Sequence, residues 1–142
     1  MIKVNPYLSY DGKAEEAFTF YKTVFGGEFT GLFRMKDAPQ SDNLSEEEKN
    51  RIMHISLPVS DTVTLMASDT LCNSGPTLTE GNNIQISLHP DSREEADRIF
   101  NGLSAGGKIV MPMQDMFWGD YFGTFADKFG IYWMVNYSTQ HG

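Results

Sequence analysis

An internal repeat is the feature that most restricts what this chain can fold into. Glu15-Glu16-Ala17 in the first half matches Glu94-Glu95-Ala96 in the second half at an offset of 79. The glycine pairs at 26–27 and 106–107 match at an offset of 80. In both halves an alternating segment comes first, an apolar stripe at helical spacing follows, and the glycines precede another alternating segment. The repeat predicts two modules with one shared topology.

The first module is predicted to contain a helix at 14–25, where apolar residues fall on one helical face. The glycine pair ends this helix, because glycine readily adopts the left-handed conformation that closes helices. Four strands are expected around it, at 4–10, 28–35, 52–59 and 63–67. A polar insertion at 37–50 interrupts the module and is interpreted as a short surface helix, a mobile flap or a solvated loop.

The second module repeats this order. Residues 84–88 alternate like a strand, and Ser92 with Glu95 forms a capping-box pattern at the start of a helix predicted at 92–104. Strands are expected at 108–113, 123–126 and 131–137. The predicted boundaries are therefore 1–70 for the first module, 71–82 for a linker rich in small and polar residues, and 83–138 for the second module.

Composition excludes several classes of function. The formal net charge is −8 and the Lys and Arg residues are scattered, which argues against nucleic-acid binding. No apolar run approaches the ~20 residues of a membrane span, and the N-terminus lacks a signal-peptide core. The single Cys72 excludes an internal disulfide. We expect a cytoplasmic protein that binds neither nucleic acid nor membrane.

Several blocks carry a family signature. The longest runs from Tyr7 to Gly27, and shorter ones are Met53-His54-Ile55, Met66-Ala67-Ser68-Asp69, Phe117-Trp118-Gly119-Asp120 and residues 127–133. Together they resemble the vicinal-oxygen-chelate superfamily of glyoxalases, bleomycin-resistance proteins and dioxygenases, and within it the PhnB-like ("demethylubiquinone methyltransferase-like") subgroup. The resemblance implies an α+β fold of two βαβββ modules, with curved mixed sheets around a cavity, and a homodimer.

The resemblance also implies a divalent metal held by His, Glu or Gln on the first and last strands of each module. The corresponding positions here offer Asn5 or Tyr7, Asn83 or Gln85, Met66, and Met134. Thioethers, amides and a phenol are poor ligands for Mg²⁺, Mn²⁺ or Zn²⁺. We therefore predict that the usual metal site is absent. No strand is followed by a glycine-rich turn that would seat a nucleotide-like cofactor, so we expect no cofactor and no methyl transfer.

The segment 114–123 is predicted to form a loop too rich in large rings to be exposed to solvent. It is interpreted as a wall of a ligand pocket, and the alternatives are a dimer contact or a core plug. His54, inside an alternating strand, is either a pocket residue or a structural one. The residues predicted to line the ligand pocket are Tyr7, His54, Gln85, Asp115, Trp118 and Phe122.

These patterns predict a small-molecule-binding protein that lacks the usual metal ligands. The alternative is a glyoxalase-, lyase- or isomerase-type enzyme that uses a non-standard metal or an acid–base site, for which His54 is the candidate. The sequence identifies no catalytic residue.

Overall fold

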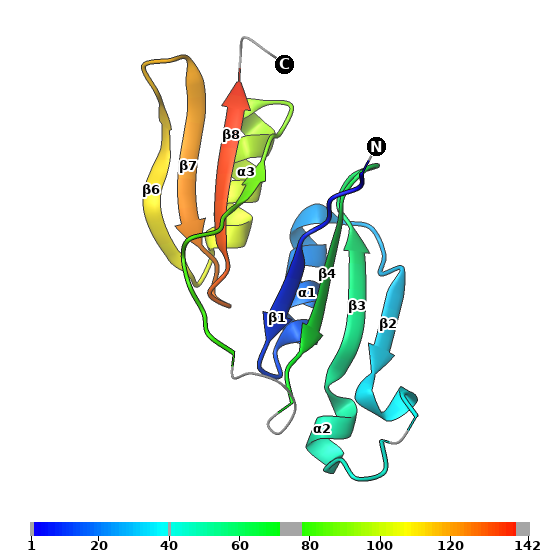
Figure 1. Ribbon diagram of the computed structural model, residues 1–142. Helices are drawn as coiled ribbons and strands as arrows, with labels where there is room; N and C mark the ends of the chain where they lie inside the picture. The colour runs from blue at the N-terminus through cyan, green and yellow to red at the C-terminus, as the bar shows by residue number, and fades with distance from the viewer. Residues whose placement is uncertain (1, 40, 72–77, 139–142) are drawn as a thin grey trace. The chain divides into compact units, whose positions relative to one another are not determined.

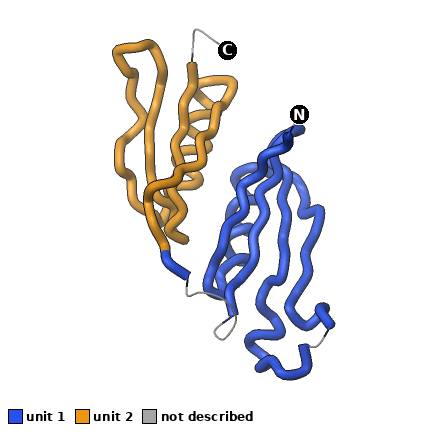
Figure 2. Tube along the Cα trace, in the orientation of Figure 1, with its two compact units in different colours: residues 1–79 blue, residues 80–142 orange. Residues whose placement is uncertain are grey.

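The computed structural model of the chain describes residues 2–39, 41–71 and 78–138 (Figure 1). It divides into two compact units, residues 1–79 and residues 80–142 (Figure 2). The first unit contains β1 (Tyr7–Tyr10), α1 (Ala14–Phe25), β2 (Gly31–Arg34), the 3-10 turn η1 (Met35–Asp37), α2 (Glu46–Asn50), β3 (Ile52–Pro58) and β4 (Thr64–Asp69). The second contains β5 (Ile86–Leu88), α3 (Arg93–Ser104), β6 (Lys108–Asp115), β7 (Asp120–Ala126) and β8 (Tyr132–Ser138).

The two units share one topology. The first forms a four-stranded sheet in the order β1-β4-β3-β2, and the second forms a four-stranded sheet in the order β5-β8-β7-β6. In each sheet the first strand lies parallel to the last, and the remaining neighbours are antiparallel. Each unit is thus a βαβββ module with a mixed sheet. The predicted α+β fold class is confirmed.

Helix α1 covers one face of the first sheet (Figure 1). Its buried side chains recur at the predicted helical spacing, and Phe18 and Tyr21 are fully buried. The Tyr10 hydroxyl on β1 lies 2.9 Å from the Tyr21 hydroxyl, so the buried phenols satisfy each other. The helix ends at Gly26, which has a φ of 79°.

Helix α3 begins at Arg93, one residue later than predicted, and Ser92 is its N-cap. The Ser92 Oγ accepts a hydrogen bond from the Glu95 backbone N–H at 3.1 Å. The Glu95 carboxylate accepts instead from the Asp91 N–H, so these bonds form only half of the predicted capping box. Phe100 packs edge-on against Phe125 of β7, with 5.1 Å between ring centroids, and anchors α3 to its sheet.

The ring-rich segment differs from its prediction. It is a β-hairpin, in which β6 runs to Asp115, β7 starts at Asp120, and the Gly119 N–H donates to the Met116 carbonyl at 3.0 Å. Phe117 is 97% exposed and Trp118 is 48% exposed in the chain. The expectation that these rings avoid solvent is wrong at the level of the single chain, because the two central positions of a turn project beyond the last strand pair.

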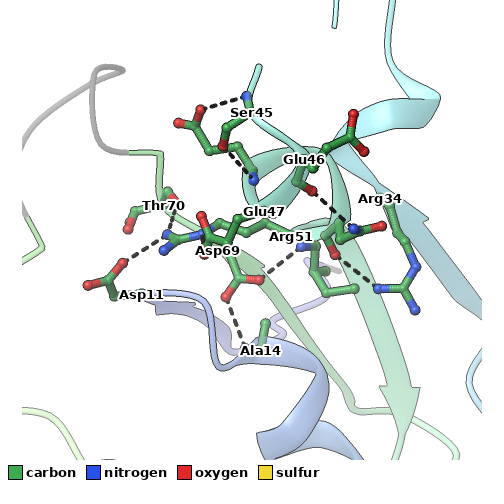
Figure 3. A network of polar contacts seen from close by, with 12 residues as sticks. Asp11, Ala14, Arg34, Ser45, Glu46, Glu47, Arg51, Asp69 and Thr70 are labelled. Carbon is green, nitrogen blue, oxygen red and sulfur yellow. Dashed lines mark hydrogen bonds and ion pairs between the residues drawn. The ribbon is translucent and has the colours of Figure 1, made fainter.

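The polar insertion contains helix α2, which side chains tie to the rest of the first unit (Figure 3). The Arg51 guanidinium donates to Glu47 at 2.9 Å, to Asp11 at 2.8 Å and to the Thr70 carbonyl at 2.7 Å. These bonds join α2 to the β1–α1 turn and to the end of β4. None of the described helices is both long and apolar enough to span a bilayer. The predicted linker at 71–82 lies partly outside the described residues, and its boundaries remain a prediction.

Candidate functional site

The first sheet has two chemically different faces. On β3 and β4, the side chains of Ile55, Leu57, Leu65 and Ala67 are buried on the side of α1. Successive side chains of a strand point to opposite faces, so the residues between these four lie on the face turned away from α1. We call this the first distal face.

Register identifies the members of the first distal face. Tyr7 pairs with Met66, Met66 with Ser56, and Ser56 with Gly31, and directly opposed residues share a face. Alternation along the strands adds the other members. These are Ser9, Phe33, His54, Pro58, Thr64 and Ser68.

Two of the predicted pocket residues meet on this face. The Tyr7 hydroxyl oxygen lies 3.4 Å from His54 Nδ1, and the ring centroids are 5.8 Å apart. If Nδ1 carries no proton the Tyr7 hydroxyl donates, and if Nδ1 is protonated the hydroxyl accepts. Tyr7 is 51% exposed and Phe33 of β2 is 53% exposed. The pair can therefore offer either a donor or an acceptor beside rings that a ligand can reach.

The first distal face carries no Asp, Glu, Lys or Arg from its four described strands. The two formally charged residues of these strands are Arg34 and Asp69, and both make their contacts on the α1 side of the sheet. Arg34 binds Glu15 of α1 through two hydrogen bonds of 2.9 and 2.8 Å. The buried Asp69 carboxylate accepts from the Ala14 and Ile52 backbone N–H groups, each at 2.9 Å. The charges of this sheet are therefore engaged in holding α1 and β3.

The second sheet has an equivalent face turned away from α3, which we call the second distal face. Ser87 pairs with Met134, and Met134 pairs with Thr124. Phe122, two residues before Thr124, pairs with Gln114 and Asn136. Phe122 therefore lies on the second distal face.

Asp115, another predicted pocket residue, lies on the α3 side of the same sheet. The Arg93 guanidinium binds its two carboxylate oxygens at 2.8 and 3.2 Å and lies over the Tyr121 ring, 3.9 Å from the centroid. This hydrogen-bonded ion pair lowers the pKa of Asp115. Asp115 thus fixes the hairpin to α3 and does not share a face with Phe122.

The other two predicted pocket residues lie outside the described strands. Gln85 precedes β5 and is exposed, and Trp118 lies at the hairpin tip, where it packs edge-on against Phe117 at 4.9 Å between centroids. The sequence reasoning missed Ser87, which pairs with Met134 as Tyr7 pairs with Met66. The offset of 80 between the glycine pairs also relates Tyr7 to Ser87, and this signal in the sequence could have identified Ser87.

The strand register bears on the positions at which the resemblance implies metal ligands. Tyr7 and Met66 are neighbours, and so are Ser87 and Met134. The alternative Asn5 is engaged elsewhere, because its Oδ1 accepts the Thr64 N–H at 2.9 Å. Among the residues that the structure describes, no group of three or more His, Cys, Asp and Glu side chains is arranged to hold a metal. A phenol, a hydroxyl and two thioethers do not fit Mn²⁺ or Zn²⁺.

Comparison with known proteins relates nearly the whole chain to one family. Residues 2–136 match the family described as 3-demethylubiquinone-9 3-methyltransferase. Protein YjdN of Escherichia coli is 31% identical over 141 residues, which cover 94% of this chain and 93% of that protein. The crystal structure of protein PA1353 from Pseudomonas aeruginosa is 36% identical and superposes with a TM-score of 0.85, covering 97% of this chain and 98% of the other.

A second solved structure carries a more informative description. It is a Bacillus cereus PhnB protein described as a putative 3-demethylubiquinone-9 3-methyltransferase, 25% identical with a TM-score of 0.77 over 96% of this chain and all of the other. A glyoxylase/bleomycin resistance protein/dioxygenase domain from Frankia shares the fold alone, at 12% identity, a TM-score of 0.64, and coverage of 100% of this chain and 93% of the other.

Proposed function

The chain belongs to the family described as 3-demethylubiquinone-9 3-methyltransferase, the PhnB-like branch of the vicinal-oxygen-chelate superfamily, and from this premise we propose that it binds a small molecule without the usual metal. The observation that carries the proposal is the contact between Tyr7 and His54 on the first distal face. It joins two polar ring side chains from β1 and β3 beside the Met66 thioether. Apolar walls with a few polar anchors are typical of small-molecule sites.

The physical basis of binding is the combination of exposed rings with fixed hydrogen-bonding groups. Tyr7 and Phe33 present ring surface, and removing apolar surface from water is worth roughly 25 cal/mol per Å². Met66 adds a polarizable wall that adapts to the shape of a ligand. The Tyr7–His54 pair then orients the ligand, because it offers a hydrogen-bonding group at a fixed place on the face.

The test is a thermal-shift screen of the full chain against metabolites, followed by variants of the distal face. A ligand that binds only the folded state at a hundredfold excess over its Kd stabilises the protein by about 2.7 kcal/mol. We expect Tyr7→Phe and Met66→Asp to lower the affinity for the selected ligand by about tenfold or more. Thr62→Ala, on the exposed β3–β4 turn, should leave that affinity unchanged. Equal affinity in the three variants would refute the site.

A second function, proton-transfer catalysis, is favoured by the same Tyr7–His54 contact. A positioned imidazole that acts as general acid or base typically contributes about 10²–10⁴-fold to a rate. If the selected ligand is turned over, His54→Gln should lower kcat by about 10²-fold or more and preserve binding. If the protein only binds, neither the wild type nor the variant turns over the selected ligand. The proposal further includes action as a homodimer in the cytoplasm, and no nucleic-acid partner.

A further inference from the structure

We infer that the ligand of the first distal face is an uncharged molecule with a flat, unsaturated ring body that carries hydrogen-bonding oxygen or nitrogen atoms. This inference rests on the proposed function and specifies the chemical class of its ligand. It follows from which side chains the sheet presents on this face and which it directs to α1.

The charge distribution across the first sheet argues against an ionic ligand. Arg34 is occupied by Glu15, and Asp69 is occupied by two backbone N–H groups, all on the α1 side. The distal side of these strands offers hydroxyls, one imidazole, one thioether and rings. An ion that leaves water without a counter-charge loses solvation free energy that these neutral groups do not replace. A neutral ligand avoids this penalty.

The hydrogen-bonding groups and the rings of this face favour a ligand with a flat ring and polar atoms. Ser56 is already bonded to Thr30, with 2.9 Å between their hydroxyl oxygens, and faces a glycine rather than a side chain at Gly31. A Cβ at Gly31 would lie 3.0 Å from the Ser56 Oγ, so this part of the face is closely packed. Tyr7 and Phe33, both about half exposed, offer ring surface on strands at opposite edges of the sheet. A flat ring can stack on such surfaces, while its polar atoms reach the Tyr7–His54 pair.

The second distal face is neutral only in part. The row formed by Ser87, Met134 and Thr124 is also neutral, and Phe122 lies beside it. The strand carboxylate of Asp115 is neutralised by Arg93 on the α3 side. Asp120, at the start of β7, accepts a hydrogen bond from Asn136 Nδ2 at 3.1 Å. Asp120 is a carboxylate that could favour a cation, so the experiment includes a cationic probe.

The experiment compares three probes that share one ring and differ in charge. They are 2-naphthol, which is neutral at pH 7, 2-naphthalenesulfonate, and trimethyl(2-naphthyl)ammonium. Each is titrated into the full chain at pH 7, and amide chemical shifts are followed by NMR. We expect 2-naphthol to bind at least about tenfold more tightly than either ion, with the largest shifts at the amides of β1, β3 and β4.

Two charge variants make the test specific. Ser68→Lys places a cation on the first distal face and should shift the preference between sulfonate and naphthol by about tenfold or more toward the sulfonate. Thr62→Lys adds the same charge on the exposed β3–β4 turn and should leave the preference unchanged. Ser9→Lys replaces Ser68→Lys if thermal unfolding shows that the latter does not fold.

The outcomes separate the ligand class from the site. If the wild-type chain binds the sulfonate or the ammonium most tightly, and the Lys variant alters that binding, the site stands and the inference of a neutral ligand is wrong. If naphthol binds but Ser68→Lys leaves the preference between naphthol and the sulfonate unchanged, the proposed site is wrong. Binding of all three probes only above about 1 mM would overturn both.

Discussion

Each unit contains a buried aspartate close to the end of a strand. Asp127 follows β7, and its carboxylate accepts from the Phe129 and Ile131 backbone N–H groups at 2.8 and 3.1 Å and from Trp133 Nε1 at 2.8 Å. Asp69 ends β4 and accepts two backbone N–H groups, as described above. These bonds stabilise a charge that burial alone would penalise, and each carboxylate fixes the chain that surrounds it.

We predict that Asp127→Ala destabilises the protein by about 3–5 kcal/mol, because one buried and two partly buried donors lose their acceptor. Urea unfolding at pH 7 measures the change. Asp61→Ala on the exposed β3–β4 turn is the control and should change the stability by less than about 0.5 kcal/mol. A loss below about 1 kcal/mol for Asp127→Ala would mean that water replaces the carboxylate without difficulty.

The pair formed by Glu15 and Arg34 predicts a pH dependence. The Arg34 hydrogen bond lowers the pKa of Glu15 below its ordinary value of 4.5. The unfolded chain therefore takes up a proton at higher pH than the folded chain does. The stabilisation is complete above pH 4.5 and is lost as the pH falls through the lower, folded-state pKa.

Glu15→Gln should accordingly cost about 0.5–1 kcal/mol at pH 7, a modest value because both side chains are partly exposed to solvent. The difference in unfolding free energy between wild type and variant should shrink below pH 4.5. Glu16→Gln is the matched control, because the Lys13–Glu16 pair is longer, at 3.5 Å, and more exposed. A gap that persists undiminished at the lowest pH would contradict the assignment to the ion pair.

At the scale of elements, Arg51 connects the insertion to the rest of the first unit. Its side chain is 12% exposed and contacts Glu47 of α2, Asp11 of the β1–α1 turn and the Thr70 carbonyl beyond β4 (Figure 3). Helix α2 has five residues and none of them is buried, so its position depends on these bonds and on the Ser45 cap.

We predict that Arg51→Gln increases amide hydrogen exchange in α2 by about tenfold or more, because charge-assisted bonds of this kind contribute about 1.5–3 kcal/mol. Lys49→Gln is the control. Its ion pair with Glu46 is 3.6 Å long, and the partner is exposed, so exchange should stay unchanged. Equal exchange in Arg51→Gln and wild type would show that α2 is held by other contacts.

At the scale of the whole molecule, the exposed hairpin tip bears on assembly. Phe117 and Trp118 lie outside the core of the second unit, and Ile109 and Val110 of β6 are about half exposed. Exposed apolar groups of this size are typical of interaction surfaces, and tryptophan is enriched among the residues that dominate them.

We predict that light scattering at micromolar concentration gives about twice the chain mass of 16.0 kDa. Phe117→Ser combined with Trp118→Ser should shift the mass toward that of one chain. The control is Ile84→Ser, which removes another exposed apolar side chain, from the segment before β5. A wild-type mass of one chain would refute the dimer, and an unchanged mass in the double variant would place the interface elsewhere.

The sequence by itself determined the elements and their order. Apolar periodicity reports which side of a helix or strand is buried, and this is why α1 was predicted at its observed bounds, and α3 to within one residue. The repeat then specified that the second unit has the same order of elements as the first. The ring-rich hairpin was misread because ring content reports a preference for burial, whereas the position of a ring within a turn decides its exposure.

Only the tertiary structure decided which side chains meet. Tyr7 and His54 are separated by 47 residues, and their contact depends on β4 lying between β1 and β3. The register that pairs Ser87 with Met134, and the direction of Asp115 toward Arg93, are likewise set by hydrogen-bond ladders between distant strands. A strand shifted by one residue presents its other side chains to the same face. Alternation in the sequence marks two faces, and pairing between strands determines which residues share one.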